Sequence, residues 1–195
     1  MRKLSYRPRN LIGRFMRDRR ANAAVEFAFI APLMLTMFFG MVEFGSAIAS
    51  MRKVTLSARN LSDLVSQSSK VTDLDIGNFN QTGKAIMTPY WTADYLTRVS
   101  QIYIDPATLM GKVKWSKGSG SDMPDRPIDS SVTVPMALRI AGSYLIYSEV
   151  NHKYVPAVGY VMAKAGIPLS DTTYTRPRQS TCVLYPQNNA ALTSC

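Results

Sequence analysis

A long apolar segment near the N-terminus constrains the fold of this 195-residue chain more than any other feature. Residues 27–42 are all uncharged and lie between Glu26 and Glu43, and with its flanks the segment grows to a run of about thirty residues that holds only these two charges. Sixteen helical residues rise about 24 Å, whereas the hydrocarbon core of a bilayer is about 30 Å thick. The extended run is long enough to cross that core, so we predict one transmembrane helix over residues 22–50.

Basic residues gather before this segment. Residues 1–20 hold eight lysines and arginines and one aspartate, a net charge of +7, out of a net charge of +10 for the whole chain. A basic flank keeps one end of a membrane helix in the cytoplasm. We therefore predict a basic cytoplasmic leader at residues 1–21 and a domain outside the cytoplasm at residues 51–195. A nucleic-acid-binding arm is disfavoured, because no stacking aromatics or binding motif follow, and no nucleic acid is expected as a partner.

A secretory signal peptide is the alternative interpretation of the same segment. Residues 46–50 read Ser-Ala-Ile-Ala-Ser and offer a cleavage site after Ala49, which would leave a secreted domain beginning at Ser50. Two observations argue against it. About twenty residues precede the apolar run, which is long for a signal peptide, and Glu43 lies between that run and the site.

Beyond residue 50, an apolar stripe predicts that the helix continues and becomes amphipathic. Its members are spaced by four, three, four and three residues, which places them on one helix face. They are Val54, Ala58, Leu61, Val65 and Ser68. We predict that this helix runs to about Val71, that residues 73–79 (DLDIGNF) break it, and that a shorter helix spans Gln81 to Tyr90 with Ile86 and Met87 facing inward.

The second half of the chain changes to the period-two pattern of strands. A stretch rich in Gly, Ser, Pro and Asp, residues 117–130, predicts a loop. The strand candidates are RVSQIYID from Arg98, KVKW from Lys112, GSYLIYSEVNHKYVP from Gly142, TTYTRP from Thr172 and CVLYP from Cys182. The expected fold class is α+β, with a long helix packed on a small antiparallel sheet.

No residue pattern indicates an enzyme. The only histidine is His152, so a His-based triad or metal site is disfavoured, and Asp73 with Asp75 are too few for a calcium loop. No Gly-rich phosphate-binding loop is present, and the two cysteines lack the spacing of a metal site. We expect no catalytic residues, no cofactor and no metal. Other charged residues are interpreted as surface groups, among them Asp122, Asp125, Asp129, Arg176 and Arg178.

Cys182 and Cys195 are the two cysteines of the chain, and both lie in the part predicted to be outside the cytoplasm. In an oxidising compartment they are candidates for a disulfide that closes a small loop, worth about 2–3 kcal/mol. The alternative is that Cys195 stays unpaired.

The segment RDRRANAAVEFAFIAPLML from Arg17 resembles the start of TadE-like proteins of the Tad (tight adherence) pilus system, where such a stretch commonly reads Arg-Gly-Ala-Ala-Ala-Val-Glu-Phe. The segment YIDPATLMGKVKWS from Tyr103 resembles the strand, turn and strand in the middle of that family. The stretch from Tyr147 to Ser180, with its Arg-Pro-Arg, resembles the C-terminal part. The resemblance covers most of the chain from Arg17 onward.

This resemblance implies a pilin-like fold and a processing site. A prepilin peptidase would cut between Ala21 and Asn22, so that Glu26 becomes the fifth residue, followed by the aromatic Phe27. Ala21 departs from the family, which usually has Gly there. In pilin-like assemblies the resemblance implies that Glu26 interacts with the N-terminal amine of its own or a neighbouring subunit. The alternative is an interfacial charge near Arg20 on an uncleaved chain.

The function that the resemblance implies is that of a minor pilin or pseudopilin in Tad (type IVc, Flp) pilus assembly. The expected location is the bacterial inner membrane, single-pass, with a cytoplasmic N-terminus and a periplasmic domain. The expected partners are a prepilin peptidase, the inner-membrane assembly platform of the Tad system, other pseudopilins and the major pilin. One alternative is an uncleaved periplasmic scaffold of the same secretion machine, and another is the secreted domain with an ordinary signal peptide.

Overall fold

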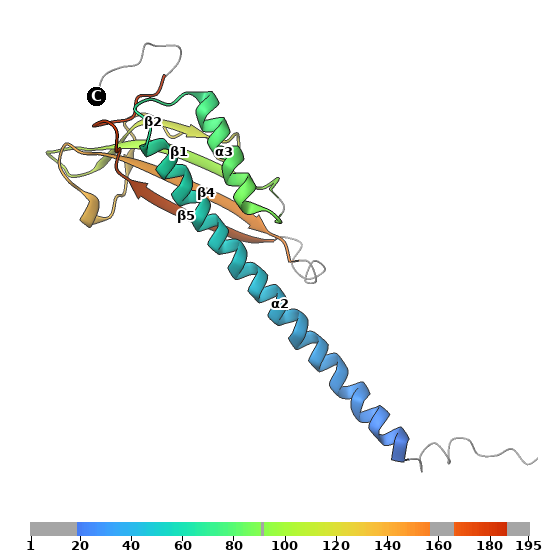
Figure 1. Ribbon diagram of the computed structural model, residues 1–195. Helices are drawn as coiled ribbons and strands as arrows, with labels where there is room; N and C mark the ends of the chain where they lie inside the picture. The colour runs from blue at the N-terminus through green and yellow to red at the C-terminus, as the bar shows by residue number, and fades with distance from the viewer. Residues whose placement is uncertain (1–18, 91, 157–165, 187–195) are drawn as a thin grey trace, which may run out of the picture. The chain divides into compact units, whose positions relative to one another are not determined.

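The structure is a computed structural model that describes residues 19–90, 92–156 and 166–186, with side chains from residue 23 onward. The chain divides into two compact units, Met1–Gly45 and Ser46–Cys195, and helix α2 (Arg19–Ser66) contributes to both (Figure 1). The second unit also contains helix α3 (Asp73–Met87), the short 3-10 helix η1 (Met136–Leu138), and the strands β1 (Leu96–Ile104), β2 (Gly111–Gly118), β3 (Ser131–Val132), β4 (Tyr144–Tyr154) and β5 (Ile167–Thr175). The fold is α+β, as predicted.

Helix α2 passes through Pro32 and ends earlier than the apolar stripe predicted. Proline has no amide proton and deprives the preceding turn of one donor, yet the helix continues on both sides, with the Thr36 hydroxyl donating to the Pro32 carbonyl at 2.8 Å. The helix ends at Ser66, not at about Val71, because the amide of Ser68 turns to the carbonyl of Val65 (3.1 Å).

Helix α3 corrects the prediction for residues 73–79. These residues form its first two turns instead of breaking a helix; the break lies before them, at residues 67–72. Thr72 caps α3, because its hydroxyl accepts from the amide of Asp75 (3.3 Å) while the Asp75 carboxylate accepts from the amide of Thr72 (2.8 Å). The carboxylates of Asp73 and Asp75 also favour the positive end of the helix dipole.

The C-terminal end of α3 lies against α2. The helix ends at Met87, before the predicted Tyr90, since Thr88 precedes Pro89 and a residue before proline is disfavoured in helical conformation. Lys53 of α2 donates to the carbonyls of Ile86 (2.9 Å) and Thr88, which places a cation at the negative end of α3.

The five strands form one antiparallel sheet in the order β3-β2-β1-β4-β5. The strands predicted from Arg98, Lys112, Gly142 and Thr172 are confirmed as β1, β2, β4 and β5, with β5 beginning earlier, at Ile167. The two-residue β3, just after the predicted loop at residues 117–130, was not predicted.

The predicted strand from Cys182 is wrong. Leu184 makes only an isolated bridge with Lys70, and the backbone of Val183 bonds to side chains of the sheet. Its amide donates to Gln101 Oε1 (2.6 Å) and its carbonyl accepts from Trp115 Nε1 (2.8 Å). The segment therefore satisfies its backbone groups across the core and does not join the strand ladder.

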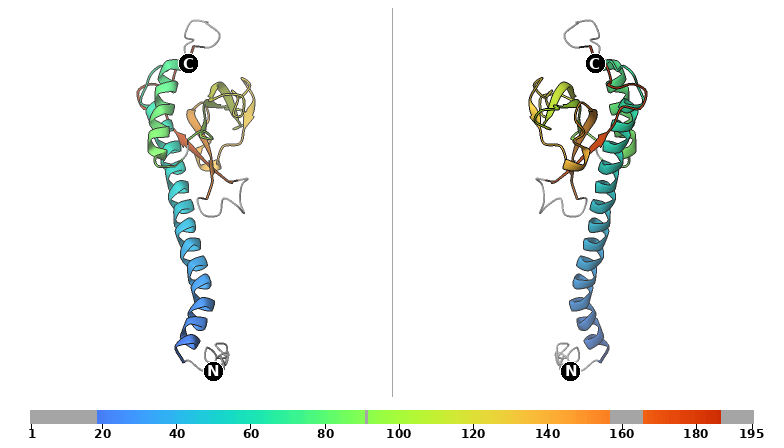
Figure 2. Two further views of the ribbon diagram at one scale, coloured as in Figure 1. Left: turned by 90° about the vertical axis from the view of Figure 1, so that its right-hand side faces the viewer. Right: turned by 90° about the vertical axis from the view of Figure 1, so that its left-hand side faces the viewer.

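Both helices of the second unit cover the same face of the sheet (Figure 2). Two serine hydroxyls set the register of α2 on the sheet. Ser148 of β4 donates to the carbonyl of Ala58 (2.6 Å), and Ser62 donates to the hydroxyl of Thr175 (2.7 Å) and lies 3.4 Å from the carbonyl of Ile146. Residue numbers rise along the helix while they fall along the strand, so the two elements run antiparallel.

The same register reaches the start of the second unit. The Tyr90 hydroxyl donates to the carbonyl of Ser46 (3.1 Å), and the Tyr90 ring packs edge-on against Tyr154, with centroids 6.0 Å apart. The end of β4 at Tyr154 therefore lies level with Ser46 of α2.

Four of the five residues of the predicted stripe are confirmed as part of the core, whereas Ser68 lies beyond the end of α2 and is only partly buried. Val54, Ala58, Leu61 and Val65, which we call the docking row, are almost completely buried. A second cluster lies on the opposite face of the sheet, because its β4 members alternate with those that face α2. Its buried members are Ile102, Ile104, Val113, Val132, Val134, Leu145 and Tyr147.

Truncation of the docking row should destabilise the second unit. Leu61 is 2% exposed, so Leu61→Ala should lower the free energy of unfolding by about 2–5 kcal/mol through lost burial and a residual cavity. Chemical unfolding of the full chain in detergent, followed by tryptophan fluorescence, measures this. Leu56→Ala is the matched control on the same helix, because Leu56 is 51% exposed, and it should change stability by less than about 1 kcal/mol. Equal effects of the two substitutions would contradict the docking of this face.

Candidate assembly surface

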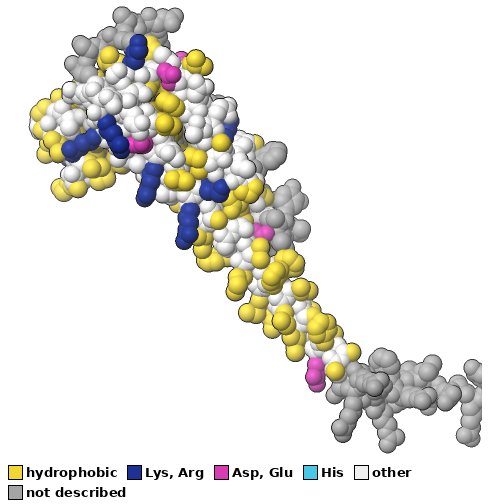
Figure 3. Space-filling model, viewed as in Figure 1, with side chains coloured by type: hydrophobic (Ala, Val, Ile, Leu, Met, Phe, Trp, Pro, Cys, Tyr) yellow, Lys and Arg dark blue, Asp and Glu magenta, His cyan; other side chains and the backbone are white. Residues whose placement is uncertain are grey.

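The part of α2 in the first unit presents large hydrophobic side chains around its whole circumference, and Figure 3 shows those on one side. The exposed ones are Val25, Phe27, Phe29, Ile30, Leu33, Met34, Leu35, Met37, Phe38, Phe39, Met41, Val42 and Phe44. This helix is long and apolar enough to cross a membrane, and its most apolar window is not buried by the protein. Monomeric soluble proteins rarely expose so large an apolar surface, and this one is suited to contact with lipid or with other apolar helices.

Glu26 and Phe27 lie at the beginning of this surface. Phe27 is 68% exposed and Glu26 is also exposed, so both side chains are available to a neighbour. Glu43 lies near the other end and is partly buried. Because seventeen residues separate the two carboxylates, they point about 100° apart around the helix and do not form one acidic face.

The predicted cleavage site is only partly described. Ala21 and Asn22 belong to α2, but their side chains lie outside those that the structure describes, and the leader before Arg19 also lies outside the described residues. Cleavage between Ala21 and Asn22 stays a prediction.

The predicted disulfide falls at the edge of the described chain. Cys182 is buried and is not a free cysteine. Cys195, the other member of the predicted pair, lies outside the described residues, so the pairing itself stays a prediction.

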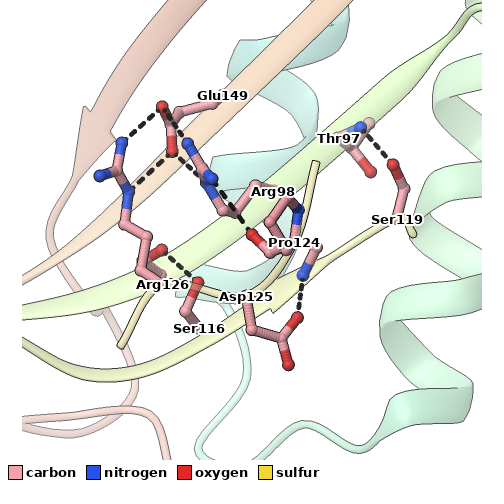
Figure 4. A network of polar contacts seen from close by, with 10 residues as sticks. Thr97, Arg98, Ser116, Ser119, Pro124, Asp125, Arg126 and Glu149 are labelled. Atoms are coloured by element: carbon pink, nitrogen blue, oxygen red, sulfur yellow. Dashed lines mark hydrogen bonds and ion pairs between the residues drawn. The ribbon is translucent and has the colours of Figure 1, made fainter. Parts of the chain in front are cut away.

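On the sheet face opposite α2, one carboxylate lies between two guanidiniums (Figure 4). Glu149 follows Ser148 in β4 and therefore points to the other side of the sheet. It accepts two hydrogen bonds from Arg98 (2.7 and 3.0 Å) and two from Arg126 (2.8 and 3.1 Å), and its side chain is 10% exposed. Arg98 lies directly opposite on β1 and also donates to the carbonyl of Pro124 (3.1 Å), so the cluster fixes the loop between β2 and β3 to the sheet.

The electrostatics of this cluster favour the charged carboxylate. Burial alone would raise the pKa of Glu149, but the hydrogen bonds and charges of Arg98 and Arg126 outweigh it and hold the pKa below its usual value. Tyr147 stacks on Tyr174 with ring centroids 4.5 Å apart, and Arg126 lies over the Tyr147 ring. Burial and then the charge of Glu149 raise the pKa of Tyr147.

The sequence holds one signal for this cluster that was not predicted above. Arg98 and Glu149 carry opposite charges and lie in two predicted strands. Two such residues can lie opposite each other on neighbouring strands and form an ion pair. Arg126 gives no such signal, because it belongs to an irregular loop.

The described residues offer little for catalysis or metal binding. No group of three or more His, Cys, Asp or Glu side chains among them could hold a metal ion. His152 is buried in β4, and burial lowers its pKa. Asp73 bonds to Lys117 (3.0 Å) and to the Tyr185 hydroxyl, and Arg178 pairs with Asp63 (2.5 Å), so these charges already have partners within the chain.

Comparison with known proteins places the N-terminal part in a recognised group. The family model described as TadE-like protein matches residues 22–60, the family that the sequence resembles. The match covers the apolar part of α2 and continues into the docking row. No curated protein and no solved structure gave a match to this chain. The TadE-like match associates the chain with the Tad pilus.

Replacement of the Glu149 carboxylate by a neutral amide should make the free energy of unfolding less dependent on pH in the acidic range. At pH 7, Glu149→Gln should cost about 2–3 kcal/mol, because two guanidiniums lose a charged partner. The folded pKa of Glu149 is depressed, so its contribution is present above the unfolded pKa, near 4.3, and is lost as pH falls through the folded value. Urea unfolding should be measured at several pH values from 7 to 3. The difference in free energy of unfolding between wild type and Glu149→Gln should become smaller below about pH 4.5.

Asp122→Asn is the control for this experiment, because Asp122 is exposed in the same loop and makes no hydrogen bond or ion pair with the described part of the chain. It should leave stability within about 0.5 kcal/mol of wild type at pH 7. If the difference in free energy of unfolding between wild type and Glu149→Gln stays constant down to pH 3, the charged form of Glu149 is not the stabilising form.

Proposed function

We propose that this chain is a minor pilin or pseudopilin that supports Tad pilus assembly and works by contacts between subunits, without catalysis. Its apolar helix would hold it in the bacterial inner membrane before assembly and would pack against the helices of other subunits afterwards. Its second unit would supply specific contacts in the periplasm. The partners in this proposal are a prepilin peptidase, the inner-membrane assembly platform, other pseudopilins and the major pilin.

The observation that carries this proposal is the pair of surfaces on α2. Residues in its first part expose thirteen large hydrophobic side chains in all directions, whereas the docking row is buried on one face by the sheet. A simple anchor of an unrelated domain needs no helix that continues into the domain core. The TadE-like match spans both parts of α2, which supports reading them as one functional element.

Glu26 has a definite role in this proposal. If the leader is removed, Asn22 carries an ammonium group one helical turn before Glu26, and the match with the TadE-like model also begins at residue 22. A carboxylate inside a bundle of apolar helices is tolerated when it is paired. The ammonium of a neighbouring subunit would pair with it and set the axial register of the assembly, and the helix N-terminus also favours the negative charge.

The topology in this proposal follows from charge. The leader carries a net charge of +7 over residues 1–20, and such a flank stays on the cytoplasmic side. The second unit would then fold in the periplasm, an oxidising compartment suited to a disulfide at Cys182.

The N-terminus of the mature protein tests the processing step. We expect terminal-peptide mass spectrometry on membrane and sheared-pilus fractions to find a chain that begins at Asn22. Ala21→Gly should raise the processed fraction, because Gly is the usual residue before the cut in the family that the chain resembles. A chain that begins at Met1 in both fractions would instead favour the uncleaved scaffold, and one that begins at Ser50 would favour the secreted domain.

Glu26→Gln tests the assembly role separately. The variant should remain in the membrane fraction, while its amount in sheared pili should fall at least about tenfold, since a buried ammonium would lose its charged partner. Glu43→Gln is the matched control on the same helix and should assemble normally. Equal incorporation of Glu26→Gln and wild type would leave Glu26 as an interfacial charge.

A further inference from the structure

A hollow of about 400 Å³ lies on the surface of α2 soon after the second unit begins. It is lined by two guanidiniums, one hydroxyl and two apolar side chains, from Arg52, Arg59, Thr55, Met51 and Leu56. Arg52 and Arg59 are seven residues apart, which is nearly two helical turns, so they flank the hollow on one side of the helix. This combination suits a ligand with an anionic group next to an apolar part.

The two arginines differ from three arginines of the second unit that pair with a carboxylate. Arg98 and Arg126 bind Glu149, and Arg178 binds Asp63. Neither Arg52 nor Arg59 makes a hydrogen bond or ion pair with any residue that the structure describes, and both are exposed. Their charges are therefore available to an anion from outside the chain.

The surroundings of the hollow indicate where that anion comes from. Ile48, one turn before Arg52, is 41% exposed and continues the apolar surface of α2. Because Tyr154 lies level with Ser46, the exposed Val155 and Ile167 at the adjoining ends of β4 and β5 lie at this same end of the unit. Exposed aliphatic side chains with adjacent cations are typical of a segment at the boundary between hydrocarbon and headgroups.

We propose that Arg52 and Arg59 bind the phosphate of an anionic phospholipid in the outer leaflet of the membrane that α2 crosses. Met51 and Leu56 would contact the glycerol and upper acyl carbons, and Thr55 would donate to a phosphate oxygen. The headgroup region extends about 5–7 Å beyond the hydrocarbon on each side, and the predicted span ends at residue 50, so Arg52 and Thr55 begin about 3 and 8 Å beyond it, at headgroup level. Arg59 begins about 10 Å further along the helix than Arg52 and lines the same hollow with its long side chain. The inference rests on the proposed single-pass topology.

The test is lipid binding by the full-length protein in detergent, measured by native mass spectrometry during titration with phosphatidylglycerol or phosphatidylcholine. Each cation near an anionic lipid surface is worth about fivefold in binding, so Arg52→Gln with Arg59→Gln should weaken phosphatidylglycerol binding roughly 25-fold. Binding of phosphatidylcholine should change less than about threefold. The control is the pair Lys70→Gln with Arg176→Gln, which removes the same charge at exposed positions outside the hollow and should keep the preference.

The outcomes separate the lipid site from the proposed topology. Loss of the preference in the Arg52 and Arg59 pair alone, with unchanged thermal unfolding, supports the site. An unchanged preference in that pair, or an equal loss in the control pair, overturns it. Displacement of phosphatidylglycerol by millimolar inorganic phosphate would show a free-phosphate site and would overturn the lipid assignment. A chain that fractionates away from membranes overturns the topology as well, whereas a membrane-bound chain without lipid preference overturns only this site.

Discussion

Burial of the docking row against β4 is the interaction on which the rest of the second unit depends. An α-helix that enters a folded domain from an apolar environment has to change from exposure on all sides to burial on one side, and α2 does this within a few turns. The buried row supplies the hydrophobic contact, and the hydroxyls of Ser62 and Ser148 fix where along the helix the strand lies. Hydrophobic contact alone has no direction, so these two hydrogen bonds determine the register.

Each face of the sheet buries an apolar cluster, and the polar contacts that accompany it differ between the two faces. The face toward α2 and α3 is closed by apolar side chains and by hydrogen bonds to the backbone of Val183. The opposite face also buries an apolar cluster, which includes Leu145 and Tyr147, and Leu138 of η1 packs against it. On that face Glu149 and its two arginines also hold the loop between β2 and β3, and such charge-assisted hydrogen bonds add a fixed geometry to the apolar contact.

Sequence patterns predicted the elements whose periodicity is strong, and failed where single side chains decide. The apolar span, the docking row and four of the strands followed from spacing alone. The start of α3 was mistaken for a break because Gly77 and two aspartates suggest a turn, whereas Thr72 and Asp75 make them a capped helix start. The segment that begins at Cys182 has the alternating pattern of a strand. Its hydrogen bonds, however, go to side chains more than sixty residues away in the sequence, and a local pattern cannot predict such partners. Of the assembly surface, the positions of Glu26 and Phe27 were predictable, while the structure was needed to show that Arg52 and Arg59 have no partner among the described residues.

The antiparallel register of α2 on β4 has a mechanical consequence. The contacts from Ser46 to Ser62 form a row parallel to the helix axis. A pull on the N-terminal end of this part of α2, along its axis, loads all of these contacts together in shear. Peeling would break them one at a time at much lower force. The second unit is thus built to stay attached to its helix under axial tension, which is the load that the proposed role in a filament would place on it.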